Sequence, residues 1–160
     1  FQVRKQVRGS FAIRPTAAGL KFGLTDSVSV ARESVDPVLS PVCRNGDIVL
    51  AEYLDGAPAV ILRPGKVPAL FCGITDIPAG LYRSFAAFAG IHLYTDRPAY
   101  VLRRGEWLSV TAPEQGFYKI STGTGDGIVD FFSGRKLGTG PELRIFFRKG
   151  ENRIFRLKPE

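Results

Sequence analysis

The chain has 160 residues, of which 44% are hydrophobic and 23% are charged, and its formal net charge is +7. These proportions are those of a globular protein with a packed core, so they exclude an extensively disordered chain. No run of about 18 apolar residues is present, which excludes a hydrophobic membrane-spanning helix. No signal-peptide segment is recognised either, so we expect a cytoplasmic protein without a membrane partner.

The first part of the chain reads as short strands separated by turns. An alternating run at 7–15 predicts a strand with Phe11 and Ile13 on one face, and Gly19 is interpreted as a break after it. Val38 and Val42, with prolines at 37 and 41, predict an extended edge strand rather than a central one.

A β-hairpin is predicted at 48–62. Two apolar runs, 48–53 and 58–62, flank an Asp55-Gly56 pair that is typical of a tight turn. The following run, 67–72, is almost entirely apolar. Strands of that kind are usually covered on both faces, as in an α/β layer.

One amphipathic helix follows the predicted strands. Pro78 suits its first turn, Asp76 is expected to cap its N-terminus, and Gly90 is expected to end it. Its apolar residues form a single stripe, namely Leu81, Phe85, Phe88 and Ala89. After the helix, the run 91–94 predicts a returning strand.

From residue 98 onward the pattern is that of a small antiparallel β-domain. Short runs alternate with glycine-rich turns, and the expected strands are 100–103, 107–112, 117–121, 128–132, 142–147 and 153–157. The predicted fold class is therefore α+β and mostly β: a partial α/β layer with one main helix, followed by a small antiparallel β-sandwich. The expected domains are 1–96 and 97–160.

Cys72 is the one residue whose setting suggests covalent catalysis. It ends an apolar strand, precedes Gly73 and is followed by a helix, which is the order of a nucleophile elbow, and His92 would then be its base. Phe71 is larger than an elbow accommodates, so we favour a buried free thiol at Cys72 and a structural role for His92. One histidine and two separated cysteines, Cys43 and Cys72, provide no zinc-type cluster, so no metal and no cofactor are expected.

Aromatic and basic residues of the C-terminal part are candidate ligand-binding residues. Four aromatic residues could stack on sugar rings, namely Trp107, Tyr118, Phe131 and Phe132. We favour core positions for them, because such residues more often fill the core. The basic pairs Arg103-Arg104 and Arg135-Lys136 would contact a carbohydrate or a polyanion, or simply form a solvated surface. A nucleic-acid partner is not favoured, because no recognition helix or RNA-binding motif accompanies the charge.

The run AGIHLYTD at 89–96 is similar to an A-G-V-H-x-Y-x-D segment near the end of the amidotransferase-like (trimerisation) domain of family-42-type β-galactosidases and related glycosidases. The runs VDFFSG at 129–134 and NRIFRL at 152–157 are similar to strands of their C-terminal β-domain. The resemblance extends over 45–157. It implies that the catalytic glutamates lie in an upstream (β/α)₈ barrel, outside this chain, and that His92 is structural.

We therefore interpret the chain as the non-catalytic, C-terminal assembly and capping portion of a glycoside-hydrolase-like protein acting in carbohydrate metabolism. Its partners would be the remainder of a longer polypeptide or a catalytic subunit, within a homo-oligomer formed through the parent protein. The absence of methionine agrees with a piece of a longer chain. Two alternatives stay open: a stand-alone basic β-module that binds carbohydrate or a polyanion, and a small hydrolase that depends on Cys72.

Overall fold

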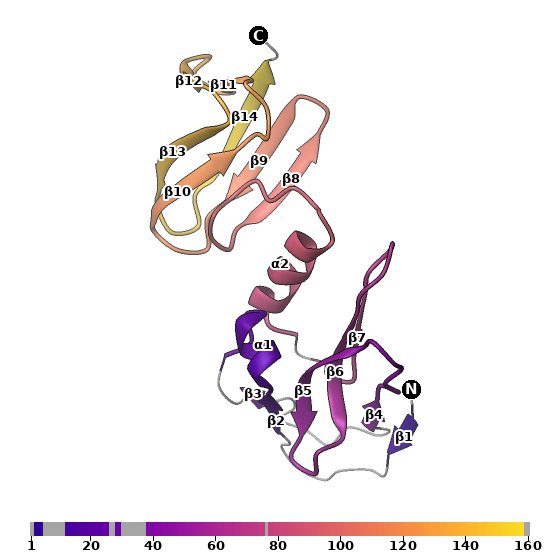
Figure 1. The fold of residues 1–160 in the computed structure, drawn as a ribbon. Helices are drawn as coiled ribbons and strands as arrows, with labels where there is room; N and C mark the ends of the chain where they lie inside the picture. Colours follow the sequence, from indigo (N-terminus) through magenta and orange to yellow (C-terminus); the bar gives the residue numbers. More distant parts are fainter. Residues whose placement is uncertain (1, 5–11, 26–27, 30–37, 76, 159–160) are drawn as a thin grey trace. The chain divides into compact units, whose positions relative to one another are not determined.

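The computed structural model describes residues 2–4, 12–25, 28–29, 38–75 and 77–158, which fall into two compact units, Phe1–Ile91 and His92–Glu160. In both units, the described residues in strands outnumber those in helices (Figure 1). The predicted α+β, mostly β fold class is therefore confirmed. Among the described residues, no helix is long and apolar enough to cross a membrane.

The first unit is built on a five-stranded antiparallel sheet with the strand order β3-β2-β5-β6-β7 (Figure 1). Its strands are β2 (Ala12–Pro15), β3 (Val28–Ser29), β5 (Ile48–Tyr53), β6 (Pro58–Arg63) and β7 (Ala69–Cys72). A separate antiparallel pair joins β1 (Gln2–Arg4) to β4 (Val38–Ser40). The predicted hairpin is confirmed as β5 and β6, which pair directly.

The prediction that the run 67–72 is covered on both faces is wrong. Its strand, β7, pairs with β6 at one edge of the sheet, and every residue of β7 is only half-buried. Val67 lies before the strand and is 84% exposed. One face of β7 packs on the core through Leu70 and Cys72, whereas Phe71 on the other face lines a surface hollow.

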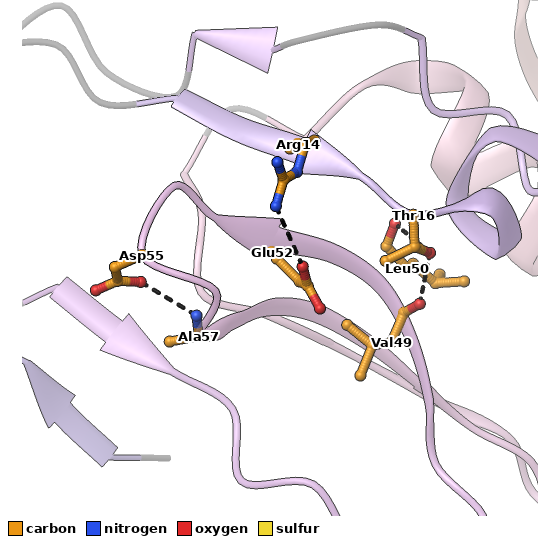
Figure 2. Close-up of polar contacts among 7 residues, drawn as sticks. All are labelled: Arg14, Thr16, Val49, Leu50, Glu52, Asp55 and Ala57. Carbon is orange, nitrogen blue, oxygen red and sulfur yellow. Dashed lines mark hydrogen bonds and ion pairs between the residues drawn. The ribbon is translucent and has the colours of Figure 1, made fainter.

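The prediction that Gly19 breaks the chain is also wrong, because Gly19 is buried inside the short helix α1 (Ala17–Lys21). Thr16 begins this helix: its hydroxyl accepts a hydrogen bond from the Gly19 N–H at 3.1 Å and donates one to the Val49 carbonyl at 2.7 Å. The backbone N–H of Thr16 donates to the Leu50 carbonyl at 3.0 Å. Figure 2 shows how these contacts join the start of α1 to β5. A side chain at position 19 would overlap the Leu50 carbonyl, so only glycine fits.

The predicted amphipathic helix is confirmed as α2 (Ala79–Phe88), with Pro78 just before it and Gly90 after it in a left-handed conformation (φ +73°). Leu81 is fully buried in the core of the first unit, whereas Phe88 is nearly half exposed and packs edge to face on Phe22. The expected cap Asp76 and Phe11, which was expected to share a strand face with Ile13, lie outside the described residues.

The second unit is an antiparallel sandwich. It consists of a five-stranded sheet of order β12-β11-β14-β9-β8 and the pair β10–β13 (Figure 1). These strands enclose one hydrophobic core. The strands are β8 (Tyr100–Arg104), β9 (Trp107–Thr111), β10 (Gly116–Ser121), β11 (Gly127–Asp130), β12 (Lys136–Thr139), β13 (Glu142–Phe147) and β14 (Asn152–Lys158). The sequence predicts six of them, whereas it places the residues of β12 in a glycine-rich turn.

The strand predicted at 91–94 is not formed. Instead the segment at the start of the second unit runs beside β10 with a single β-bridge, between Thr95 and Ile120. The Ser121 N–H donates to the Tyr94 carbonyl at 2.9 Å, and His92 Nε2 lies 2.9 Å from the Ser121 carbonyl oxygen. These contacts satisfy backbone groups without a regular ladder, so the run is extended but irregular.

Candidate functional site: a groove on the outer face of the second unit

The five-stranded sheet of the second unit has one face in the core and one face outside it. Leu108 and Val110 of β9 and Phe155 and Leu157 of β14 are buried in the core. Since successive side chains of a strand point to opposite faces, the residues between them form the outer face. Trp107, Ser109, Ile154 and Arg156 are those residues.

Strand pairing arranges the outer face in rows, because residues paired across strands point to the same side. One row, here called the basic row, crosses all five strands. In strand order from β8 to β12, it consists of Arg104, Trp107, Arg156, Val129 and Lys136. The row therefore places three cations and the tryptophan in one line.

The neighbouring row is apolar. Leu102 pairs with Ser109, and Ser109 pairs with Ile154. Phe131 continues this row, since its backbone N–H donates to the Ile154 carbonyl at 2.9 Å. Ser109 is much smaller than its neighbours, so the surface is hollow above it.

This hollow is a groove of about 400 Å³, and we refer to it as the apolar groove. It is lined by Leu102, Arg104, Trp107, Ser109, Phe131 and Ile154. Leu102 is 71% exposed and Phe131 is 49% exposed, so large apolar side chains face solvent here. Exposed apolar side chains that gather around one groove make it a candidate site of interaction with another molecule.

The aromatic rings beside the groove cross one another rather than forming a flat platform. The rings of Trp107 and Phe131 meet edge to face, with centroids 5.2 Å apart and planes at 90°. The Arg156 guanidinium carbon lies 5.5 Å from the Trp107 ring centroid, over the ring, and its Nε donates to Glu106 at 2.8 Å. One face of the indole is therefore already occupied by a cation that an acidic neighbour holds in place.

The structure brings some of the predicted ligand-binding residues together and separates others. Arg104 and Trp107 both line the apolar groove, and Lys136 lies at the far end of the basic row. Arg103 belongs to the opposite side of β8, where its Nη1 donates to the Tyr94 hydroxyl at 2.8 Å. Arg135 lies in the β11–β12 turn, and its carbonyl accepts from the Asp130 N–H at 2.9 Å.

The prediction that the aromatic residues fill the core is right for Tyr118, which is fully buried, and wrong for two phenylalanines. Strand β11 ends at Asp130, so Phe131 and Phe132 lie in the turn that follows, and Phe132 is 76% exposed. Leu102 and Ile154 were not singled out from the sequence. Their alternation with residues that point inward is the signal that places them on this face.

Cys72 and His92, the candidates for covalent catalysis, belong to different units. Cys72 ends β7, and burial raises the pKa of its thiol to about 11, so the thiol is protonated at neutral pH. The ring of His92 packs edge to face on Tyr94 at 4.6 Å. Within the described part of the chain, no group of three or more His, Cys, Asp or Glu side chains is arranged to hold a metal ion.

A second hollow, of about 270 Å³, lies in the first unit. It is lined by Pro41, Val42, Arg44, Ile61, Arg63 and Phe71. The Arg63 guanidinium there donates two hydrogen bonds to the Asp47 carboxylate and stacks over the Phe71 ring. This cation is therefore engaged in contacts that stabilise the first unit.

Comparisons with known proteins identify the fold. No protein-family model matches the chain, and no curated protein matches it. The crystal structure of β-galactosidase from Bacillus circulans sp. alkalophilus is similar over 97% of this chain, with 15% identity and a TM-score of 0.60. A GH42 β-galactosidase from G. stearothermophilus covers 98% of this chain at 14% identity with a TM-score of 0.48.

The chain spans 24% of the length of the Bacillus circulans protein and 23% of the other. The first of these matches shows that the chain has the fold of a segment of a β-galactosidase. The resemblance to β-galactosidases read from the sequence is thus confirmed at the level of fold.

Proposed function

We propose that the chain is a non-catalytic portion of a glycoside-hydrolase-like protein and that it serves in assembly. The likeness in fold to about a quarter of a β-galactosidase supports this, since function resides in sites and such a segment need not carry the site. The reacting carboxylates would then lie elsewhere in the parent protein, in a part that corresponds to the rest of that enzyme.

The observation that carries the assembly role is the apolar groove with its exposed walls. Leaving Leu102, Phe131 and Phe132 in water is unfavourable by about 25 cal/mol for each Å² of apolar surface. Covering these side chains with a protein surface removes that cost, and buried aromatic anchors dominate the energy of protein interfaces. The parent protein would present this face to a neighbouring domain or subunit, within a homo-oligomer.

A carbohydrate-binding role is the second candidate, and Trp107 in an exposed groove favours it. Two features weigh against it. Sugar rings stack best on open aromatic faces, whereas Arg156 covers one face of the indole and Phe131 meets it edge-on. Sugar hydroxyls also need hydrogen-bond partners, and the hydroxyl on the groove floor, Ser109, already accepts from Asn152 Nδ2 at 2.9 Å.

Two measurements test the proposal. Native mass spectrometry of the protein from its natural source is expected to give a larger complex or a longer polypeptide. A lone 17.5 kDa monomer would overturn the assembly role. The chain alone is expected to hydrolyse a chromogenic β-galactoside no faster than buffer does. Turnover by the purified chain would overturn the proposal that it is non-catalytic.

A further inference from the structure

We infer that the apolar groove receives an aromatic side chain from an acidic polypeptide segment, whose carboxylate binds Arg104. This inference rests on the proposed assembly function and names the chemistry of the partner. It commits to a protein segment rather than a sugar or a polyanion, and three features of the groove carry it.

The first feature is the size and lining of the groove. At about 400 Å³ it falls at the small end of the range of binding pockets, about 300–1,000 Å³, which suits one large side chain rather than an oligosaccharide. Leu102 and Ile154 form aliphatic walls on either side of Ser109. Trp107 and Phe131 present crossed rings, and a third ring can add to such a pair edge to face.

The second feature is the charge at the rim. Arg104 lines the groove and makes no ion pair within the described part of the chain. The nearby cation Arg156, by contrast, is bound to Glu106 at 2.8 Å. An incoming carboxylate therefore finds one uncommitted guanidinium, beside the apolar lining, in a unit where basic residues outnumber acidic ones. A guanidinium binds a carboxylate in a two-pronged geometry, which would fix the orientation of the segment.

The third feature is what the groove lacks for the other ligands. A polyanion is held by several free cations at once, and each neutralised phosphate contributes about 0.9 to the slope of log affinity against log salt. With Arg156 committed to Glu106, the groove itself offers Arg104 alone. An acidic segment with one carboxylate in reach matches that single charge better than a polyanion does.

Binding in the groove can be followed by intrinsic fluorescence, because the one tryptophan of the chain, Trp107, lines the groove. Tryptophan emission of the full chain would be followed while blocked tripeptides are added, with the sequences Glu-Phe-Glu, Lys-Phe-Lys and Glu-Ala-Glu. We expect saturable binding of Glu-Phe-Glu. Binding of Lys-Phe-Lys should be about tenfold weaker, as for one ion pair of about 1.4 kcal/mol, and Glu-Ala-Glu should give no saturable change.

Substitutions test the contribution of the Arg104 charge separately from that of the apolar lining of the groove. Arg104→Gln should abolish the preference for Glu-Phe-Glu over Lys-Phe-Lys. Arg103→Gln is the matched control, because it removes the same charge from the same strand on the opposite side, and it should leave binding unchanged. Ser109→Ile fills the groove floor with a residue that suits a strand, and it should abolish binding of every peptide while circular dichroism shows an intact fold.

Equal binding of the acidic and basic peptides, or no binding of either, would overturn the inference. So would a saturable emission change with galactose oligosaccharides or heparin fragments but not with peptides, since the groove would then be a carbohydrate or polyanion site. Failure of the assembly proposal is seen separately, as a monomer in the native mass spectrum. If the Ser109→Ile variant still forms the native complex, the assembly proposal holds but the contact uses another surface. The inference about the apolar groove would then be wrong.

Discussion

The carboxylate of Asp47 and the guanidinium of Arg63 meet through two hydrogen bonds, Nε to Oδ1 at 2.8 Å and Nη2 to Oδ2 at 2.7 Å. Asp47 also accepts from the Arg44 N–H at 2.8 Å, and its side chain is only 2% exposed. The Arg63 hydrogen bond, followed by that from Arg44, lowers the pKa of Asp47 to about 2. The pair joins the turn before β5 to the end of β6.

This ion pair should make the first unit sensitive to acid. Since the folded pKa is lowered from 3.8 to about 2, the stabilisation is present above pH 3.8 and is lost as the pH falls through 2. Thermal unfolding should show Asp47→Asn to be less stable than the wild type at pH 6, with the difference shrinking toward pH 2. Glu52→Gln is the control, because it removes a weaker ion pair, in which Glu52 Oε2 lies 3.9 Å from Arg14 Nη2 and both side chains are more exposed (Figure 2). A pH-independent difference would contradict the ion-pair account.

Gly19→Ala should destabilise the first unit although alanine is the better helix former. Its methyl group would overlap the carbonyl of Leu50, and moving α1 away from β5 would cost about 1–3 kcal/mol. Gly65→Ala is the control: its methyl group would have ordinary contact distances, the nearest being 3.7 Å to the Val67 carbonyl. Urea unfolding of both variants measures the difference, and equal stabilities would show that the contact with Leu50 relaxes freely.

Two phenylalanines of the second unit should respond very differently to truncation. Phe155 is fully buried and packs on Phe147, so Phe155→Ala should cost about 3–5 kcal/mol. Phe132 is mostly exposed, so Phe132→Ala should change the free energy of unfolding by about 0.5 kcal/mol or less. Chemical denaturation followed by Trp107 emission compares them, and similar losses would mean that Phe132 is covered in solution.

Cys72 should react slowly with iodoacetamide. With a pKa of about 11, roughly one Cys72 in a thousand is a thiolate at pH 8, whereas Cys43 is exposed to the reagent. Intact-mass and peptide analysis should find Cys43 labelled first, and labelling of Cys72 should accelerate as the pH rises toward 11. The Cys43→Ser variant isolates the second reaction. Rapid labelling of Cys72 at pH 8 would indicate an activated thiol and revive the hydrolase hypothesis.

The sequence predicts local structure well where the signal itself is local. The β5–β6 hairpin, the helix α2 and the strands around Trp107 follow from turn residues and hydrophobic periodicity, and the structure has them at nearly the predicted bounds. Gly19 was misread because its role depends on a carbonyl that is distant in sequence, at Leu50. Strand β12 was missed because a glycine-rich turn and a short strand have the same composition.

The candidate site was predicted only in part for a similar reason. Arg104 and Trp107 are conspicuous in the sequence, but their neighbours in the groove come from strand pairing. Ile154 reaches Ser109 only through the pairing of β14 with β9, which joins segments more than 40 residues apart. Phe131 is exposed because it lies opposite Ile154 and so continues the outward-facing row just after β11 ends. Hydrophobicity alone assigns such a residue to the core.

The irregular segment at the start of the second unit affects where the chain can be cut. Strand β10 pairs with β13 on one side, and residues 92–96 cover its other side through the Thr95–Ile120 bridge and the bond from the Asp96 N–H to the Lys119 carbonyl. A chain shortened to begin at residue 97 would leave that side of β10 open. Open strand edges pair with other chains, so the shortened protein should aggregate, whereas one that begins before His92 should remain dispersed.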